Sequence, residues 1–265
     1  MSLIAFASAK GSPGVTETVM GLAGVWPTEA VVADLDPVGG DIGLRLRRHD
    51  GAPLDHDHGL LSLGVAVRGG QTAHLDDHLQ TTDGGLDTLI GVTGPGQVLG
   101  LGAAWPHVGT ALRSAGVDVL ADCGRLSPGT PVAPVVERAS ALVFVVRSDI
   151  AALAHLRERL VWLAEPLRIG RVDGVPAGVL LVGDPRDSRS ADDLEKLLAS
   201  AGLDVPVLGT VAHDPKTIRV LHTASPRVLR RSVFVRSLAD VALRVQALAA
   251  RANTQDFTTQ RFEEV

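Results

Sequence analysis

Short apolar segments alternate with longer amphipathic segments along most of the chain, and this alternation limits the fold more than any other sequence feature. Each apolar segment is rich in Val, Leu and Ile, which is typical of a strand buried on both faces. The predicted strands span residues 3–7, 30–33, 86–92, 117–121, 141–146, 177–182 and 205–211. Helical spacing of apolar residues predicts helices over residues 150–163, 192–203 and 235–248. We therefore predict an α/β fold, a doubly wound and mainly parallel sheet with helices on both faces and a ligand site at the carboxyl ends of its strands.

The chain has 265 residues, enough for one sizeable core and short for two independent ones. We predict a single domain over residues 1–251. The polar segment 252–265 lacks a periodic apolar pattern, so we expect a flexible tail there. Residues 47–70 have the least regular pattern, and we expect them to project from the sheet.

Charge and cysteine content exclude several classes of protein. The formal net charge is −5 at pH 7, so the molecule as a whole is not built to condense on nucleic acid or anionic lipid. Cys123 is the single cysteine, which excludes an internal disulfide, a cysteine-based zinc site and an iron–sulfur dimer that needs several cysteines per chain. No apolar run approaches the length of a membrane helix. We expect a cytoplasmic protein with no stable membrane insertion.

The loop after the first predicted strand, residues 9–17, has the composition of a phosphate-binding loop. Glycines let such a loop turn its backbone N–H groups toward phosphates, and a Ser/Thr hydroxyl at the start of the next helix holds Mg²⁺. Gly11, Gly14 and Thr16 supply these parts here. A Gly/Pro turn followed by ordinary helix capping is the alternative interpretation.

Aspartates end two of the later strands. Asp34 and Asp36 follow the second strand, and Asp122 ends the strand predicted at 117–121. Carboxylates at this edge can hold the water shell of Mg²⁺ and orient an attacking water. Each aspartate alone is consistent with a turn or capping residue, but the three features in this chain order favour a nucleotide site over a structural turn.

With these motifs the sequence resembles the ParA/MinD family of deviant Walker A P-loop ATPases, and among its members it looks most similar to the TadZ/CpaE-like and partition-type proteins. The resemblance extends to about Leu248. Lys10 to Thr16 matches the family's phosphate loop, Asp34 to Asp36 its second acidic motif, 119–122 its Walker B strand, and 207–214 its base-proximal stretch.

The resemblance implies that the protein binds ATP and Mg²⁺ as a homodimer. It implies that Asp36 positions the hydrolytic water and that Lys10 crosses the dimer to the partner's phosphates. It places Mg²⁺ at Thr16, Asp36 and Asp122. The residues implied to bind the nucleotide are Gly11, Ser12, Pro13, Gly14, Val15, Thr16, Glu17, Asp184, Ala212 and Asp214.

The loop departs from the family pattern at two positions. Val15 stands where the family has its P-loop lysine, and Glu17 where it often has a second threonine. A valine cannot place charge on the phosphate oxygens, and a carboxylate in the first turn of a helix repels an anion. Near the base, Ala212 replaces a proline and Asp184 follows the strand where an asparagine is usual. We therefore predict weak ATP binding and weak or absent hydrolysis.

We interpret the protein as a nucleotide-dependent, dimerising positional switch that localises DNA or a protein assembly. The first alternative is a non-catalytic pseudo-ATPase scaffold that binds a protein partner. A remote alternative is a dinucleotide-binding Rossmann protein with Asp34 on the ribose, but the loop lacks the Gly-x-Gly-x-x-Gly pattern.

Two charged clusters each allow a functional and a structural interpretation. The first predicts either non-specific DNA binding or a solvated helix face, and comprises Arg219, Arg227, Arg230 and Arg231. The second predicts either a zinc site or, as we favour, a solvated polar loop, and comprises His49, Asp55, His56, Asp57 and His58.

Overall fold

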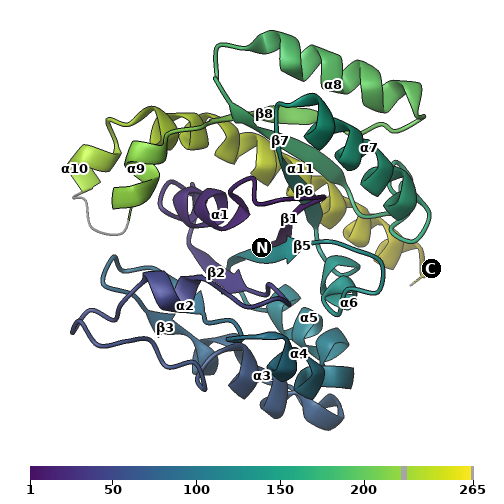
Figure 1. Ribbon diagram of the computed structural model, residues 1–265. Coiled ribbons are helices and arrows are strands. Elements are labelled where there is room, and N and C mark those ends of the chain that lie inside the picture. Colours follow the sequence, from purple (N-terminus) through teal and green to yellow (C-terminus); the bar gives the residue numbers. More distant parts are fainter. Residues whose placement is uncertain (222–225, 264–265) are drawn as a thin grey trace.

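A computed structural model describes residues 1–221 and 226–263, without the side chains of residue 226 and of residues 252–263. Within these residues one sheet of eight strands has the order β3-β4-β2-β5-β1-β6-β7-β8 (Figure 1). All neighbouring strands are parallel except the short pair β3 and β4. The strands are β1 (Leu3–Ser8), β2 (Ala30–Asp34), β3 (Gln80–Thr81), β4 (Asp87–Leu89), β5 (Asp118–Arg125), β6 (Ala141–Arg147), β7 (Ala177–Gly183) and β8 (Val207–Ala212).

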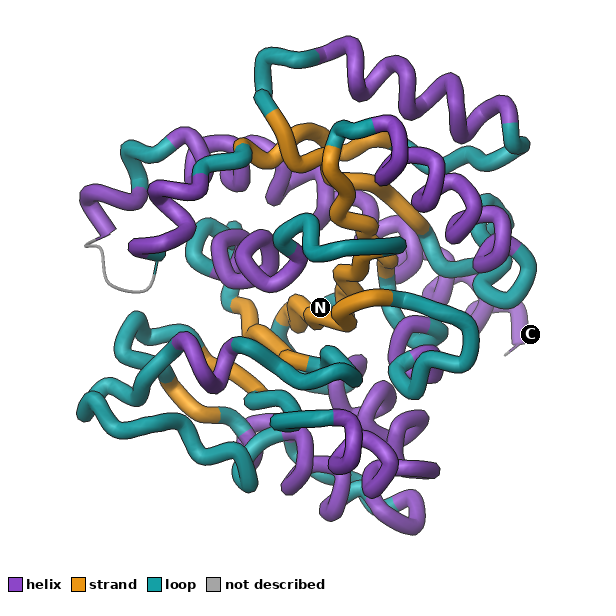
Figure 2. The backbone as a smooth tube through the Cα atoms, in the orientation of Figure 1, coloured by secondary structure: helices purple, strands orange, loops and turns teal. Residues whose placement is uncertain are grey.

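Helices cover both faces of this sheet, and Figure 2 shows them surrounding the strands. The longer ones are α1 (Val15–Ala23), α3 (Leu60–Ala66), α4 (Pro95–Leu101), α5 (Trp105–Arg113), α7 (Ile150–Ala164), α8 (Ser188–Ser200) and α11 (Val233–Glu263). Short ones are α2 (Ile42–Arg45), α6 (Ala133–Val136), α9 (Pro215–Val220) and α10 (Pro226–Leu229), with 3₁₀ turns at Arg68–Gly70, Leu75–His78 and Gly102–Ala104.

Two buried clusters, one on each face, hold these layers together. Strand β1 divides its side chains between them, with Leu3 and Ala5 in one cluster and Ile4 and Phe6 in the other. The first cluster joins the sheet to α3 through α8, and the second joins it to α1, α2 and α11. The predicted fold class is therefore confirmed, because near-continuous apolar strands require cover on both faces.

Local details differ from the sequence analysis at one edge of the sheet. The strand expected over 86–92 has only the three residues of β4, and it pairs with β3, which no sequence pattern indicated. The segment 47–70 does not project throughout, because α3 places Leu60 and Leu63 in the core with no exposed surface.

Helix α11 continues to Glu263 through most of the segment for which a flexible tail was expected, and residues 264–265 lie outside the described part. No helix among the described residues is both long enough and apolar enough to span a membrane.

Candidate functional site

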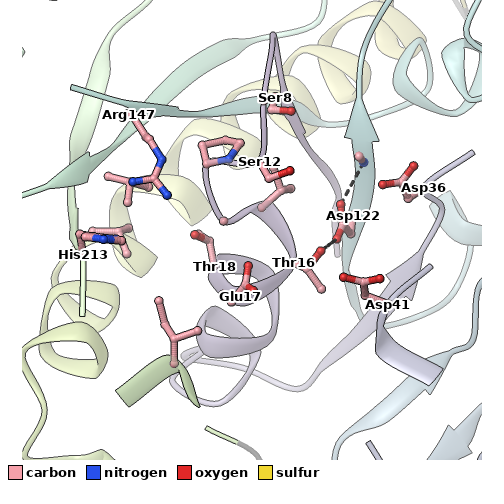
Figure 3. Close-up of a pocket in the computed structure, with 18 of the residues that line it drawn as sticks. Ser8, Ser12, Thr16, Glu17, Thr18, Asp36, Asp41, Asp122, Arg147 and His213 are labelled. Atoms are coloured by element: carbon pink, nitrogen blue, oxygen red, sulfur yellow. Dashed lines mark hydrogen bonds between the residues drawn. The ribbon is translucent and has the colours of Figure 1, made fainter. Parts of the chain in front are cut away.

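A cavity of about 640 Å³ opens at the carboxyl ends of β1, β2, β5, β6 and β8, around the N-terminus of α1 (Figure 3). Most of its wall comes from the loop 11–14, the first turn of α1, and the segments that follow β2, β5 and β8. Its polar and charged lining includes Ser8, Ser12, Thr16, Glu17, Thr18, Asp36, Asp41, Arg45, Asp122, Arg125, Arg147, His213 and Arg219. The position agrees with the sequence expectation for a doubly wound sheet.

The loop between β1 and α1 owes its shape to two glycines. Gly11 has a φ of 72° and Gly14 a φ of 101°, a backbone conformation that other residues rarely adopt. Gly14 precedes Val15, the first residue of α1, and no side chain caps that end of the helix. The first N–H groups of a helix lack partners within the helix, so this end of the cavity can accept an anion.

We call Thr16, Asp34, Asp36 and Asp122 the acid side of the cavity. Asp34 and Asp122 are register partners on the parallel strands β2 and β5, so pairing alone brings their carboxylates together. The Thr16 hydroxyl donates to Asp122 Oδ2 at 2.6 Å, and the Gly124 N–H donates to Asp122 Oδ1 at 2.9 Å. The predicted magnesium residues of α1 and β5 are therefore in direct contact.

Asp34 is as completely buried as Asp122. It accepts from the N–H of Ile42 at 3.2 Å, and 1% of its surface is exposed. A methyl group at Gly40 would come within 2.2 Å of the Asp34 carboxylate. Burial, and then the charge of Asp122, raise the pKa of Asp34 to about 8. Burial thus favours the protonated form of Asp34.

Burial also raises the pKa of Asp122, to about 6, although the bonds from Thr16 and Gly124 favour its ionised form. The pKa of Asp36 is raised by burial as well, and its carboxylate accepts from the Val38 N–H at 2.9 Å. Gly124 has a φ of 60°, and a methyl group there would lie 2.3 Å from the Asp36 carboxyl carbon. Among the described residues, the hydrogen bonds to the three carboxylates of the acid side come from backbone N–H groups and from the Thr16 hydroxyl.

Glu17 is held by an arginine that the sequence analysis did not single out. Arg45 of α2 contacts Glu17 Oε1 at 2.5 Å and Asp41 Oδ2 at 2.6 Å. The exposed fraction is 32% for the Arg45 side chain, 18% for Glu17 and 52% for Asp41. The ion pair with Glu17 is therefore the more buried of the two. Glu17 is thereby neutralised in part, and its repulsion of an anion is smaller than its position in the sequence suggests.

Val15 faces both the cavity and the core. It is 7% exposed and belongs to the cluster under α1 and α11, while it also contributes to the cavity wall. Positive charge enters instead from Arg125, Arg147 and Arg219, which we call the arginine side. Figure 3 shows Arg147 and His213 across the loop from Asp36, Asp41 and Asp122. Arg125 and Arg147 each end a strand, so an arginine closing an apolar run is the signal that could have indicated them.

Three predicted site residues lie elsewhere. Lys10 points away from the cavity, and its Nζ bonds His155 Nε2 of α7 at 2.8 Å. Asp184 accepts from the Arg186 N–H in the turn after β7. Asp214 caps α9 through the N–H and hydroxyl of Thr217, between the lining residues His213 and Pro215. The other predicted residues, from Gly11 to Glu17 with Asp36, Asp122 and Ala212, line one cavity.

The two charged clusters identified in the sequence lie in different surroundings in the structure. In the described part of the chain, no group of three or more His, Cys, Asp and Glu side chains is arranged to hold a metal, and this includes His49 and residues 55–58. In the arginine cluster, Arg219 lines the cavity, whereas Arg227, Arg230 and Arg231 are exposed on and after α10.

The acid side has the chemistry that Mg²⁺ requires. Mg²⁺ takes oxygen ligands, retains several waters, and binds through one or two carboxylates together with substrate phosphates. Thr16 and Asp122 offer such oxygens beside the glycine loop. A cation there would favour the ionised form of Asp122 and so offset the effect of burial on its pKa. The residues present therefore fit a magnesium ion, with the phosphates of a nucleotide over the loop.

Comparison with known proteins gives a clear result for the fold alone. No protein-family model and no curated protein sequence matches the chain. Among solved structures, a ParA family ATPase from Chlorobium tepidum TLS superposes with a TM-score of 0.68 at 17% identity, over 91% of this chain and 98% of that one. The septum site-determining protein MinD from Pyrococcus horikoshii OT3, solved with Mg-ADP, gives 0.68 at 18%, over 95% and 98%. MinD from Pyrococcus furiosus gives 0.70 at 18%, over 93% and 99%. The chain thus has the fold of these ParA and MinD structures.

Proposed function

We propose that the protein is a nucleotide-dependent positional switch of the ParA/MinD type, which binds Mg·ATP in the cavity around Gly14 and hydrolyses it slowly or not at all. The observation that carries the proposal is the contact between the Thr16 hydroxyl and Asp122 beside a glycine loop at a helix N-terminus. The fold shared with a MinD structure that holds Mg-ADP supports the same conclusion.

Each part of the site receives a role from its chemistry. The N–H groups at Gly14 and the first turn of α1 would bind phosphate oxygens. Thr16 would ligate Mg²⁺ directly, and Asp122 would accept bonds from its water shell. Asp36, next to this shell and exposed to the cavity, would orient a water near the terminal phosphate. When bound, Mg²⁺ supplies charge neutralisation of the phosphates.

We expect weak hydrolysis because an uncharged residue, Val15, begins α1. Catalysis of phosphoryl transfer consists of positioning and electrostatic stabilisation, so the lysine of a P-loop acts mainly through its charge. Val15 brings no charge, and its side chain is packed in the core. Arg125, Arg147 and Arg219 supply charge from other parts of the cavity lining, which supports binding without placing a donor in the loop itself.

We propose further that nucleotide promotes a homodimer through the face that carries the loop. In this structure Lys10 is bonded to His155 of its own chain, so contact with a partner's phosphates requires this bond to break. Exposed Arg227, Arg230 and Arg231 would give the dimer weak, sequence-independent affinity for DNA, and a protein cargo remains the alternative load.

Light scattering with and without Mg·AMPPNP, combined with a phosphate-release assay, tests the switch. We expect a shift from monomer to dimer on addition of Mg·AMPPNP, reduced in Lys10→Ala, and turnover near background. A protein that stays monomeric at high concentration with nucleotide contradicts the switch. Phosphate release that depends on Asp36 at rates typical of family ATPases contradicts the role assigned to Val15.

A non-catalytic scaffold is the second candidate, and Glu17 in the first turn of α1 favours it. A carboxylate at this end of a helix repels an anion, and the ion pair with Arg45 reduces that repulsion only in part. A ligand that binds only the folded state at a hundredfold over its Kd adds about 2.7 kcal/mol to stability. A thermal unfolding curve that millimolar Mg·ATP leaves unchanged would therefore select the scaffold.

A further inference from the structure

A second hollow, of about 380 Å³, lies beside the nucleotide cavity on the α7 side of the loop. Its lining is Ala9, Lys10, Arg125, His155, Glu158 and Arg159. Arg125 belongs to the walls of both hollows, because it ends β5 between the loop and α7. His155 and Arg159 are four residues apart on α7 and thus share one face of that helix.

The charges of this hollow are unbalanced. Lys10, Arg125 and Arg159 are cations, and Glu158 is the one acid in the lining. Glu158 is already paired, because its Oε1 lies 2.5 Å from Arg157 Nη1. Lys10 Nζ lies 2.8 Å from Nε2 of His155, so its bonded partner is an imidazole ring and not a carboxylate. Among the described residues, no carboxylate is bonded to Lys10, Arg125 or Arg159.

Arg159 and Arg125 show most directly that a counter-ion is missing. Both line the hollow, and no carboxylate among the described residues is bonded to either. The guanidinium of Arg159 lies over the ring of Trp162, 5.5 Å from the centroid. Burial and the charge of Arg125 lower the pKa of Arg159. Two like charges at close range cost free energy, which an anion bound between them would recover.

We propose that Lys10, Arg125, His155 and Arg159 form a second anion site, separate from the nucleotide cavity, that binds a phosphate-type oxyanion. Two guanidinium groups and an ammonium group present donors suited to a tetrahedral dianion. The ligand is either free inorganic phosphate or a phosphate group of a nucleotide. The site needs no nucleotide in the neighbouring cavity, so it can exist even where the proposed switch does not.

The ring resonances of His155, assigned with His155→Gln, report on this hollow directly. The probe is potassium phosphate, titrated against potassium chloride at constant ionic strength, with Mg·AMPPNP in a parallel arm. We expect a saturable movement of the His155 resonances with phosphate. Loss of one charge-assisted bond should weaken binding about tenfold in Arg159→Gln and in Arg125→Gln. Arg171→Gln removes the same charge from an exposed site outside the hollow and should leave the titration unchanged.

The parallel arms identify the source of the anion. Movement with inorganic phosphate in monomeric protein assigns the site to a free anion. Movement with Mg·AMPPNP alone assigns it to a nucleotide phosphate only where Arg159→Gln weakens it, because breaking the bond between Lys10 and His155 on dimerisation would also move these resonances. Variants are compared only where their thermal unfolding stays cooperative, and either arginine variant suffices for the comparison. Resonances that stay fixed in both arms overturn the proposal, as does an equal response of the wild type, Arg159→Gln, Arg125→Gln and Arg171→Gln.

Discussion

The acid side and the arginine side of the cavity are built in different ways. Strand register and a hydrogen bond position the acid side. Asp34 and Asp122 are register partners on the adjacent strands β2 and β5, and the Thr16 hydroxyl donates to Asp122. The arginine side consists of exposed side chains from the ends of β5 and β6 and from α9, with no ion pairs among the described residues. The fold thus fixes where a metal would bind, while the charge for phosphate comes from residues that the scaffold holds loosely.

The difference explains how the cavity keeps its shape whatever side chain stands at position 15. Val15 is one residue in the first turn of α1, and the glycine loop and the bond from Thr16 to Asp122 do not depend on it.

The largest effect on stability should come from Gly124→Ala, because the new methyl group would displace Asp36 of the acid side. The new methyl group would meet the Asp36 carboxylate at 2.3 Å, on a backbone with a φ of 60°. Gly116→Ala is the matched control, because Gly116 has a φ of 79° and open space around its Cα. We expect the control to lose about 1–2 kcal/mol of unfolding free energy from backbone strain alone. Gly124→Ala should lose more than the control in chemical denaturation, and equal losses would show that Asp36 is free to move.

The next effect is the pH dependence of stability, because Asp34 and Asp122 bind protons more tightly in the folded protein than in the unfolded chain. Burial raises the pKa of Asp34 to about 8 and of Asp122 to about 6, from 3.8 in the unfolded chain. The stabilisation from these protons is complete below about pH 4 and is lost as the pH rises through 6 and 8. The free energy of unfolding should therefore fall over this window, by at most about 1.4 kcal/mol per pH unit for each group.

Asp34→Asn tests this dependence, since the amide oxygen can still accept from the Ile42 N–H. The variant should be more stable than the wild type at pH 8 and should show a shallower pH dependence. Asp173→Asn removes a charge from an exposed loop and should keep the wild-type slope. Denaturation curves of Asp34→Asn and wild type with identical slopes between pH 5 and pH 8 would contradict the raised pKa of Asp34.

Much of this arrangement follows from the sequence, and the reasons for the exceptions are physical. Buried strands and Asp34, Asp36 and Asp122 were predictable, because apolar runs mark parallel strands and their ends share one edge. Strand β3 was not predictable, because its two residues are too few to show an alternating apolar pattern. The bond from Lys10 to His155 and the pair of Glu17 with Arg45 join segments 145 and 28 residues apart, and only the packing of α7 and α2 brings them together.

A smaller effect is expected from restoring charge in the loop. Val15→Lys with Glu17→Thr adds a cation and removes an anion in the first turn of α1, and the lysine can reach the cavity that Val15 lines. Nucleotide affinity should rise about tenfold, the scale of one charge-assisted bond. Asp193→Asn, which removes an exposed carboxylate of α8 outside the cavity, is the control and should change affinity little. An unchanged affinity in the double variant would mean that the arginine side already supplies the charge.

Calorimetric titration of Mg·AMPPNP into the wild type and into Thr16→Val tests the central claim that the acid side and the glycine loop bind a nucleotide without a P-loop lysine. Val keeps the shape of Thr16 and removes the hydroxyl that donates to Asp122 at 2.6 Å. We predict saturable binding to the wild type that requires Mg²⁺ and is weakened in Thr16→Val. Absence of binding at millimolar nucleotide, or binding that neither chelation of Mg²⁺ nor Thr16→Val weakens, would contradict it.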